Sequence, residues 1–294
     1  MRQANTLARI AVVLALAAGA VVPAASFSGL EVSHRARALH PGEVVVLEVR
    51  PSLTPLAVEA TAFGRDVRFF EGESDGVWRG LVGIDLTAEP GEYDVAVRAV
   101  IGAGAAAYTI YTLEVEPKEF PTRHLRVNPN YVDPPQAVID RILREQDEVA
   151  AIFLAASPER LWQGGFEAPV PGRATSSFGR RSVYNGQPRS PHSGTDFRAG
   201  TGVPVKAPNA ATVVLTGDLY FSGQVVILDH GWGLYSYFAH LSAVDVAEGD
   251  VVTRGQVVGK VGATGRVTGP HLHWTVRLND ARVDPLSLME LLGD

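Results

Sequence analysis

Hydrophobic and polar residues alternate from Val32 to about Val115, and turn-forming pairs such as Pro41-Gly42 and Pro90-Gly91 interrupt the alternation. Period-two alternation between turns is typical of β-strands with one buried face. Short strands at this spacing predict an N-terminal β-sandwich of immunoglobulin-like kind over residues 30–117, without a chemical motif. The expected strands are Val44–Val49, Leu56–Ala60, Val67–Phe70, Trp78–Val82, Tyr93–Arg98 and Tyr108–Leu113.

A connector over residues 118–161 follows, and its pattern changes to a helical period. Asp133 precedes two prolines and Gln136, which predicts an N-cap with a back-reaching amide and a helix over 134–156. Apolar side chains recur on one face of this helix, so we expect it to dock against a domain and to hold the two domains in a defined orientation. These side chains are Val138, Ile142, Val149, Ile152 and Phe153.

Residues 162–294 are again strand-patterned, and glycine lies between nearly all of the expected strands. We expect a mostly antiparallel β core with a groove across one face. The whole chain is therefore predicted to be mainly β, with one connecting helix.

The first residues have the pattern of an export signal, because Arg2 and Arg9 precede an apolar run from Ile10 to Val22. Thirteen apolar residues are fewer than the roughly 20 that span a bilayer. We predict a signal peptide over residues 1–25, cleaved near Ala24 or Ala25, and a periplasmic or cell-envelope location. An uncleaved membrane anchor is the alternative.

The composition of the chain narrows the range of possible binding partners. The 294 residues carry a net charge of −6 without a run of lysine and arginine, which argues against nucleic acid. The apolar content of 46% suits a globular core, and the absence of cysteine excludes disulfides. A glycan or a peptide is the better partner, and the oligomeric state stays open.

Histidines and one aspartate carry the candidate chemistry. On a strand, His271 and His273 project to one side while Leu272 faces the other. His192 and Asp196 are four apart, and Gly194 between them permits a tight bend that brings imidazole and carboxylate together. A catalytic zinc ion commonly takes three such ligands and keeps one position open, although ligands of this kind also accept other divalent ions. His240 ends the apolar run that starts at Gly233, and period-two counting places it on the face of Leu234, Ser236 and Phe238 at the mouth of a sheet.

These residues resemble the lysostaphin-type, or LytM-like, zinc endopeptidases, which cut peptide cross-links in bacterial cell walls. The resemblance runs from about Phe166 to Leu288 and implies a zinc peptidase domain over residues 162–294. It includes Ser177-Phe-Gly-Arg180, His192-x-x-x-Asp196, Asp229-His-Gly231, Tyr237-x-x-His240, Gly249-Asp-x-Val252 and Gly269-Pro-His-Leu-His273.

The resemblance assigns a role to each motif residue. His192, Asp196 and His273 are similar to the zinc ligands, and His240 and His271 to the pair that flanks the reacting water. Tyr184 and Asn185 are candidates for holding the substrate or the tetrahedral intermediate. The implied chemistry is metal-assisted hydrolysis of a peptide bond in peptidoglycan. The chain lacks the His-Glu-x-x-His helix, so a histidine takes the place of the glutamate base, and either His240 or His271 fits that role.

Three alternatives remain. Taken alone, His-x-His is most often a pair of half-exposed polar residues. The Gly249–Gly259 segment also resembles hairpins of biotinyl and lipoyl carrier domains, but Lys260 lies in a strand-like run and the histidines would be unexplained. A non-hydrolytic activator of other wall enzymes is the third, and the filled ligand positions favour activity.

His34, His40 and His124 lie outside the domain, His230 is expected to end a strand, and Asp284-Pro285 to form a turn. The N-terminal domain is expected to act as a spacer or as a packing partner for the enzyme, or else to contact the wall, shield the active site or bind a regulatory protein. The peptide bond that is cut stays open.

Overall fold

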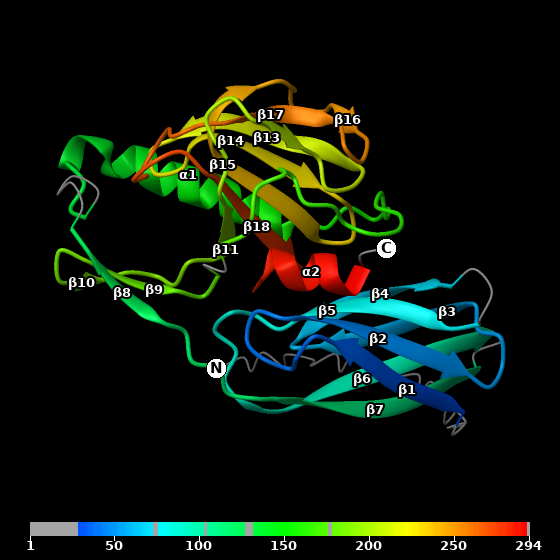
Figure 1. Cartoon of the computed structure of the whole chain (residues 1–294). Coiled ribbons are helices and arrows are strands. Elements are labelled where there is room, and N and C mark those ends of the chain that lie inside the picture. The colour runs from blue at the N-terminus through cyan, green and yellow to red at the C-terminus, as the bar shows by residue number, and fades with distance from the viewer. Residues whose placement is uncertain (1–28, 73–75, 103–104, 127–131, 176–177, 293–294) are drawn as a thin grey trace, which may run out of the picture.

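A computed structural model describes residues 29–72, 76–102, 105–126, 132–175 and 178–292. The predicted signal peptide lies outside the described residues, as does Ser177 of the first motif. Among the residues it describes, no helix has the length and apolar character needed to cross a membrane. Two large β-sheets dominate the chain, so the mainly β prediction is confirmed (Figure 1).

The N-terminal sheet has seven antiparallel strands in the order β1-β2-β5-β4-β3-β6-β7. Alternate side chains of these strands, including Leu47, Val97 and Leu113, are buried in a common core, as the period-two pattern predicts. The immunoglobulin-like topology stays a prediction. The strands are β1 (Leu30–Ala36), β2 (Val44–Pro51), β3 (Ala57–Ala62), β4 (Arg65–Glu71), β5 (Trp78–Gly83), β6 (Gly91–Gly102) and β7 (Ala105–Val115).

The C-terminal sheet has nine strands, and all of its strand pairs are antiparallel, as expected. Its buried core contains Phe197, Phe238 and Trp274. The strands are β11 (Gly194–Phe197), β12 (Pro204–Lys206), β13 (Ala211–Leu219), β14 (Gly223–Asp229), β15 (Leu234–Val244), β16 (Val251–Val252), β17 (Val257–Val261), β18 (Leu272–Leu278) and β19 (Ala281–Val283).

A small third sheet joins the connector to the C-terminal domain. Its order is β10-β9-β8, and β8 pairs in parallel with β9, with Thr122 opposite Arg181. The connector therefore contributes a strand that the sequence pattern did not predict. The strands are β8 (Thr122–Leu125), β9 (Arg181–Tyr184) and β10 (Gln187–Pro188).

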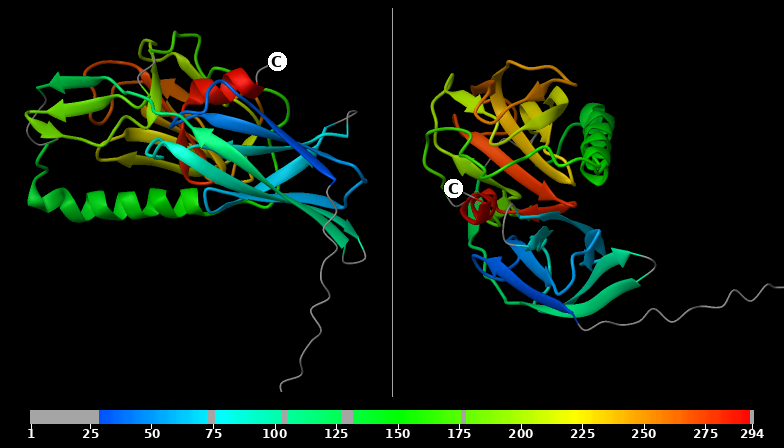
Figure 2. Two further views of the ribbon diagram at one scale, coloured as in Figure 1. Left: turned by 90° about the horizontal axis from the view of Figure 1, so that it is seen from below. Right: turned by 90° about the vertical axis from the view of Figure 1, so that its right-hand side faces the viewer.

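Helix α1 (Gln136–Leu154) lies along the C-terminal sheet in both views of Figure 2. Phe153 is buried and makes edge contacts with the rings of Tyr235 and Tyr237 on β15, so the predicted docking is confirmed. The predicted cap is wrong. Pro135 occupies the N-cap position without a side-chain hydrogen bond, and the Asp133 carboxylate instead accepts hydrogen bonds from Gln187 on β10.

The two large sheets are held together by the last helix, α2 (Pro285–Leu292), which lies between them in Figure 1. Val44 and Leu81 of the N-terminal sheet belong to the same buried core as Val283 and Leu288. Because this core is continuous, the N-terminal sheet is more than a tethered spacer.

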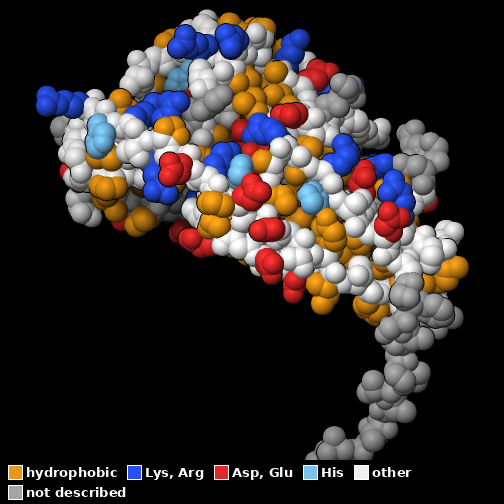
Figure 3. Space-filling view, turned by 60° about the horizontal axis from the view of Figure 1, so that its bottom comes forward, with side chains coloured by type: hydrophobic (Ala, Val, Ile, Leu, Met, Phe, Trp, Pro, Cys, Tyr) orange, Lys and Arg blue, Asp and Glu red, His pale blue; other side chains and the backbone are white. Residues whose placement is uncertain are grey.

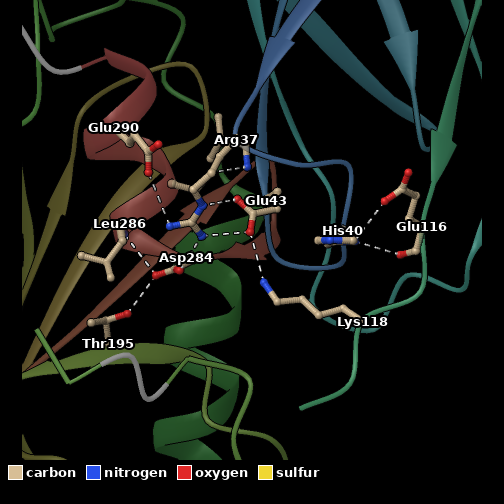
Figure 4. Close-up of polar contacts among 11 residues, drawn as sticks. Arg37, His40, Glu43, Glu116, Lys118, Thr195, Asp284, Leu286 and Glu290 are labelled. Atoms are coloured by element: carbon tan, nitrogen blue, oxygen red, sulfur yellow. Dashed lines mark hydrogen bonds and ion pairs between the residues drawn. The ribbon is translucent and has the colours of Figure 1, made fainter.

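Polar contacts reinforce the same interface (Figure 4). The Arg37 guanidinium donates to Glu43 at 2.9 Å and to Asp284 at 2.8 Å, and Glu43 is almost fully buried. The Val44 amide donates to Ser287 Oγ, and Thr195 donates to Asp284 Oδ1 at 2.9 Å. Asp284-Pro285 was expected to be a turn. It instead begins α2, because Asp284 Oδ1 accepts from the Leu286 amide in the manner of an N-cap.

Candidate metal centre and cleft

The register of the C-terminal sheet brings the predicted ligands together. β18 lies between β11 and β15, and His273 is directly opposite Asp196 on one side and Ala239 on the other. Directly opposed residues of antiparallel strands have Cβ atoms about 4.5–5.5 Å apart, so their side chains meet without a special loop. Leu272 points into the core while His271 and His273 line a cleft, as the strand pattern predicts.

Three candidate ligands converge on one small volume. His192 Nε2 lies 3.3 Å and His273 Nδ1 lies 3.1 Å from Asp196 Oδ1. One ligand atom from each of the three residues falls within 4.8 Å of the others. Two imidazole nitrogens and a carboxylate oxygen form a donor set that suits a divalent ion with nitrogen and oxygen ligands. The residues therefore fit a metal site.

Charge and burial act in opposite directions at this site. Burial alone would raise the pKa of Asp196, but the hydrogen bonds and charges of His192 and His273 outweigh it and hold that pKa far below its usual value. Burial lowers the pKa of His273, and Asp196 opposes this only partly. Asp196 is therefore ionised and His273 favours its neutral form, which are the protonation states that bind a metal.

Neighbouring side chains fix the orientation of the ligands. His273 Nε2 lies 2.9 Å from Thr275 Oγ1, which leaves Nδ1 directed at Asp196. Gly194 does not form the predicted tight bend between His192 and Asp196. It is the first residue of β11, and an added Cβ would come within 2.6 Å of the Trp274 carbonyl oxygen and 2.7 Å of His273 Cε1. Gly194 is needed because the two strands approach closely beside the ligand.

His240 reaches the cleft through a β-bulge, so the predicted face was wrong. Val226 is opposite Phe238 and Gln224 is opposite Leu241, which leaves one residue of β14 facing two residues of β15. Phe238 and Leu241 both point into the core, and His240, with φ of 64°, turns to the opposite face. β15 also continues to Val244, so His240 does not end the strand.

His240 and His271 lie side by side next to the ligands, with ring centroids 5.0 Å apart. His240 Nδ1 lies 2.9 Å from the Thr264 carbonyl oxygen, and His271 Nδ1 lies 2.9 Å from that of Gly269. A carbonyl oxygen only accepts, so both Nδ1 atoms carry the hydrogen and both Nε2 atoms present a lone pair when the rings are neutral. His271 Nε2 is 3.6 Å from Asp196 Oδ1.

These five residues lie in a cleft of about 1030 Å³ between the small sheet and the C-terminal sheet. Tyr184 on β9 lines the cleft, and the Arg266 guanidinium lies 5.4 Å from the centre of its ring. Asn185 is not among the lining residues. Asn185 and Gly186 have φ values of 50° and 87° and form the turn between β9 and β10, as Asn-Gly commonly does.

Comparison with known proteins places this arrangement in a family. The model of peptidase family M23 matches residues 190–285, which contain all five histidine and aspartate candidates. The crystal structure of a Pseudomonas aeruginosa protein assigned to peptidase M23 is 37% identical, covers 85% of this chain and 95% of that chain, and superposes with a TM-score of 0.68. The chain belongs to peptidase family M23. The resemblance read from the motifs is therefore confirmed.

Curated relatives match less than half of the chain. The DD-carboxypeptidase/endopeptidase Mpg of Neisseria meningitidis is 40% identical over 128 residues, 43% of this chain and 30% of the relative. The peptidoglycan DD-endopeptidase ShyA of Vibrio cholerae is 41% identical over 103 residues, 35% of this chain and 24% of the relative. The chain thus spans less than a third of the length of these two relatives.

The range matched by the M23 family model also divides the remaining candidates. Tyr184 and Asn185 lie outside the matched range, whereas the carrier-domain-like segment Gly249–Gly259 lies inside it. His230 is not a ligand: it follows β14, is fully buried, and holds the Ala210 carbonyl and Ser236 Oγ through its two ring nitrogens. Sequence reasoning missed Thr264 and Thr275, whose signal is visible only once the strands are paired.

Proposed function

We propose that this M23 peptidase is a zinc-dependent endopeptidase that hydrolyses peptide bonds of bacterial peptidoglycan. One observation carries the proposal: His192, Asp196 and His273 offer converging ligand atoms in an open cleft, beside two more imidazoles held by backbone carbonyls. A core histidine cluster without a ligand would not need this access to solvent.

Zinc suits the donor set, and Thr275 supplies a partner for the far nitrogen of His273, as is usual for histidine ligands. When bound, the ion supplies a Lewis acid and lowers the pKa of a coordinated water toward about 7. His192, Asp196 and His273 would hold it.

His240 and His271 provide the proton transfers. Their Nδ1 hydrogens are engaged by the Thr264 and Gly269 carbonyls, so each ring presents Nε2 to the cleft. One ring would accept a proton from the attacking water and could then pass it to the leaving amine, and the other, when protonated, would stabilise the developing oxyanion. Burial, together with the positive charge that His273 and His271 can carry, lowers the pKa of His240 to about 3, which favours its neutral form.

The relatives support the proposed substrate and location. Mpg is named a DD-carboxypeptidase/endopeptidase and ShyA a peptidoglycan DD-endopeptidase. A cleft of about 1030 Å³ has room for a peptide that enters from the surface. Export to the periplasm or cell envelope, directed by residues 1–25, would bring the enzyme to this substrate. Tyr184 lines the same cleft and is proposed to contact the peptide.

The test uses purified peptidoglycan and the mature protein, either zinc-loaded or treated with a chelator. We expect the zinc-loaded protein to release peptide fragments whose masses identify the bond that is cut, and the chelated protein to release none until zinc is returned. Zinc that binds stoichiometrically without any fragment release would contradict the proposal and favour the non-hydrolytic activator.

Replacing one catalytic histidine separates chemistry from metal binding. His271→Ala should lower the hydrolysis rate at least about 100-fold, because it removes a proton-transfer group, while zinc stays bound. Fragment release and zinc content by elemental analysis are measured on the same sample. His273→Ala is the comparison and should lose zinc as well as activity. Full activity of His271→Ala would show that the role assignment is wrong.

A further inference from the structure

Arginines gather around the cleft from segments far apart in the sequence. Of the described residues that line it, six are arginines and one, Asp196, is acidic. This contrasts with the chain as a whole, whose net charge is −6. On the face drawn in Figure 3, basic side chains are most frequent over the upper and left parts and acidic ones lower down. We call these residues the arginine cluster: Arg123, Arg126, Arg180, Arg189, Arg198 and Arg266.

The cluster differs from the other arginines in its partners. Outside the cleft, arginines commonly pair with carboxylates, as Arg35 does with Glu48, Arg98 with Glu59 and Arg282 with Asp85. Within the cluster, Arg266 aside, no carboxylate of the described residues lies within the 4.0 Å of an ion pair. Arg123 donates to Ser182 Oγ, and Arg189 donates to the Val132 carbonyl and to Gln187, all neutral groups.

Two members of the cluster lie next to the proposed metal ligands. The Arg180 carbonyl accepts a hydrogen bond from the His192 amide at 3.0 Å. Arg198 immediately follows β11, two residues after Asp196, and the side chains of both line the cleft. Positive charge therefore flanks the place where a peptide bond would be cut.

Guanidinium groups that share a cleft repel one another until an anion neutralises them. A concave surface with charge of one sign also concentrates the field and attracts ligands of the opposite sign. Arginine presents a planar pair of donors that matches a carboxylate in a bidentate geometry. A ligand with several carboxylates spaced along a backbone suits arginines spread over both walls of the cleft better than a neutral peptide does.

We propose that the arginine cluster binds the free carboxylates of an acidic peptide, and so selects cross-linked peptides with free carboxylates over amidated peptides or neutral glycine bridges. This inference deepens the proposed function and depends on it for the reaction. It assigns substrate selection to Arg180 and Arg198, beside the metal ligands, and to the other cluster members farther along the walls.

The test compares two synthetic cross-linked peptides that differ only in whether their carboxylates are free or amidated. The zinc-loaded full chain should cleave the free-carboxylate peptide with a kcat/KM at least about tenfold higher. Arg180→Gln and Arg198→Gln should each raise KM for that peptide by about three- to tenfold, with kcat little changed and the amidated peptide unaffected. Arg173→Gln is the matched control, because Arg173 is an exposed arginine of the same domain that does not line the cleft.

A binding measurement keeps this inference separate from the reaction. Anisotropy of the labelled intact peptides on the metal-free protein should show the same preference for free carboxylates, and the two glutamine variants should lose it. Equal cleavage or equal binding of both peptides would overturn the inference and leave the proposed hydrolase in place. A short oligonucleotide of equal charge that competes as well as the acidic peptide would also overturn it, since it would indicate general anion binding. If neither peptide nor peptidoglycan is cut, the proposed function fails, and the anisotropy result still decides the cluster.

Discussion

His230 should make folding stability depend on pH through a single buried ring. Burial lowers the pKa of His230 to about 4, and the hydrogen bond from its ring to the Ala210 carbonyl opposes this only partly. Below about pH 6.5 the unfolded chain binds a proton that the folded chain excludes, so the free energy of unfolding falls as pH falls. The decrease is about 1.4 kcal/mol per pH unit, levels off near pH 4, and totals about 3 kcal/mol.

Urea unfolding of the metal-free protein at several pH values between 7.5 and 4.5 measures this dependence. Other histidines titrate in the same range, so the informative quantity is the difference between the wild type and His230→Gln, which cannot take up this proton. The difference should shrink as pH falls. Parallel curves for the two proteins would mean that His230 is not the group responsible, and an NMR titration of its ring would check the assignment directly.

At the scale of single residues, the sequence predicted which side chains meet but not how each gets there. His192, Asp196 and His273 lie together because strands β11 and β18 are in register, and alternation along the strand was enough to place His271 with His273. Period-two counting placed His240 on the wrong face, because the extra residue of the β-bulge reverses the face of every residue that follows it. A glycine at the position of positive φ can mark a bulge in a sequence. Here that residue is a histidine, so the sequence alone did not indicate the bulge.

At the scale of elements, the close pairing of β11 with β18 makes Gly194 a sensitive position. An added methyl group would meet the Trp274 carbonyl oxygen, His273 Cε1 and Thr275 Oγ1 at 2.6–2.7 Å. Since strand backbone cannot move without disturbing the ladder, Gly194→Ala should lower the free energy of unfolding by about 1–3 kcal/mol. It should also weaken zinc binding, because the contact displaces a ligand ring.

Gly200→Ala is the matched control for this change. Gly200 follows β11 on the same segment, and an added Cβ there would meet nothing within 4 Å. Thermal unfolding and zinc affinity by chelator competition should therefore change for Gly194→Ala and stay near the wild type for Gly200→Ala. Equal effects of both substitutions would show that loss of glycine flexibility, and not the contact with His273, is responsible.

The helix termini illustrate what an element's own sequence can and cannot determine. The run of Asp133, two prolines and Gln136 has the composition of a cap, yet Asp133 bonds to Gln187 on a neighbouring strand and α1 begins without a side-chain cap. Asp284-Pro285 has the same kind of composition and does begin α2. Local composition thus marks where a helix starts, while competing tertiary partners decide whether the side chain caps it.

At the scale of the whole molecule, the arginine cluster was invisible to inspection of the sequence. Its members come from β8, from both ends of the β9–β10 hairpin, from the end of β11 and from the loop before β18. No window of the chain is strongly basic, so inspection of the sequence did not reveal the positive cleft. The unexpected strand β8 matters here, because it brings part of the connector onto the wall of the cleft.

The interface between the two large sheets leads to a prediction about Arg37. Burial alone would raise the pKa of Glu43, but the Arg37 guanidinium outweighs burial and holds it below its usual value. Arg37→Ala would leave Glu43, whose side chain is 2% exposed, with Lys118 as its remaining cation, and would remove the ion pair to Asp284. Loss of one partner from a buried ion pair costs about 3–5 kcal/mol. Because the Arg37 side chain is 27% exposed, water screens part of this, and we expect a loss of about 2–3 kcal/mol.

Arg35→Ala is the matched control, since Arg35 lies in β1 two residues before Arg37 and pairs with Glu48, but its side chain is 51% exposed. Its substitution should cost less than about 1 kcal/mol. Glu43→Gln in the Arg37→Ala background removes the unpaired charge and should recover part of the stability lost.

The sign of the pH dependence gives an independent check. A carboxylate with a lowered pKa stabilises the fold above the pKa of the unfolded chain, and this stabilisation is lost as pH falls through the folded-state value. Acid should therefore weaken the wild type more steeply than Arg37→Ala, and equal acid sensitivity of the two would mean that Arg37 does not stabilise the contact between the sheets through Glu43.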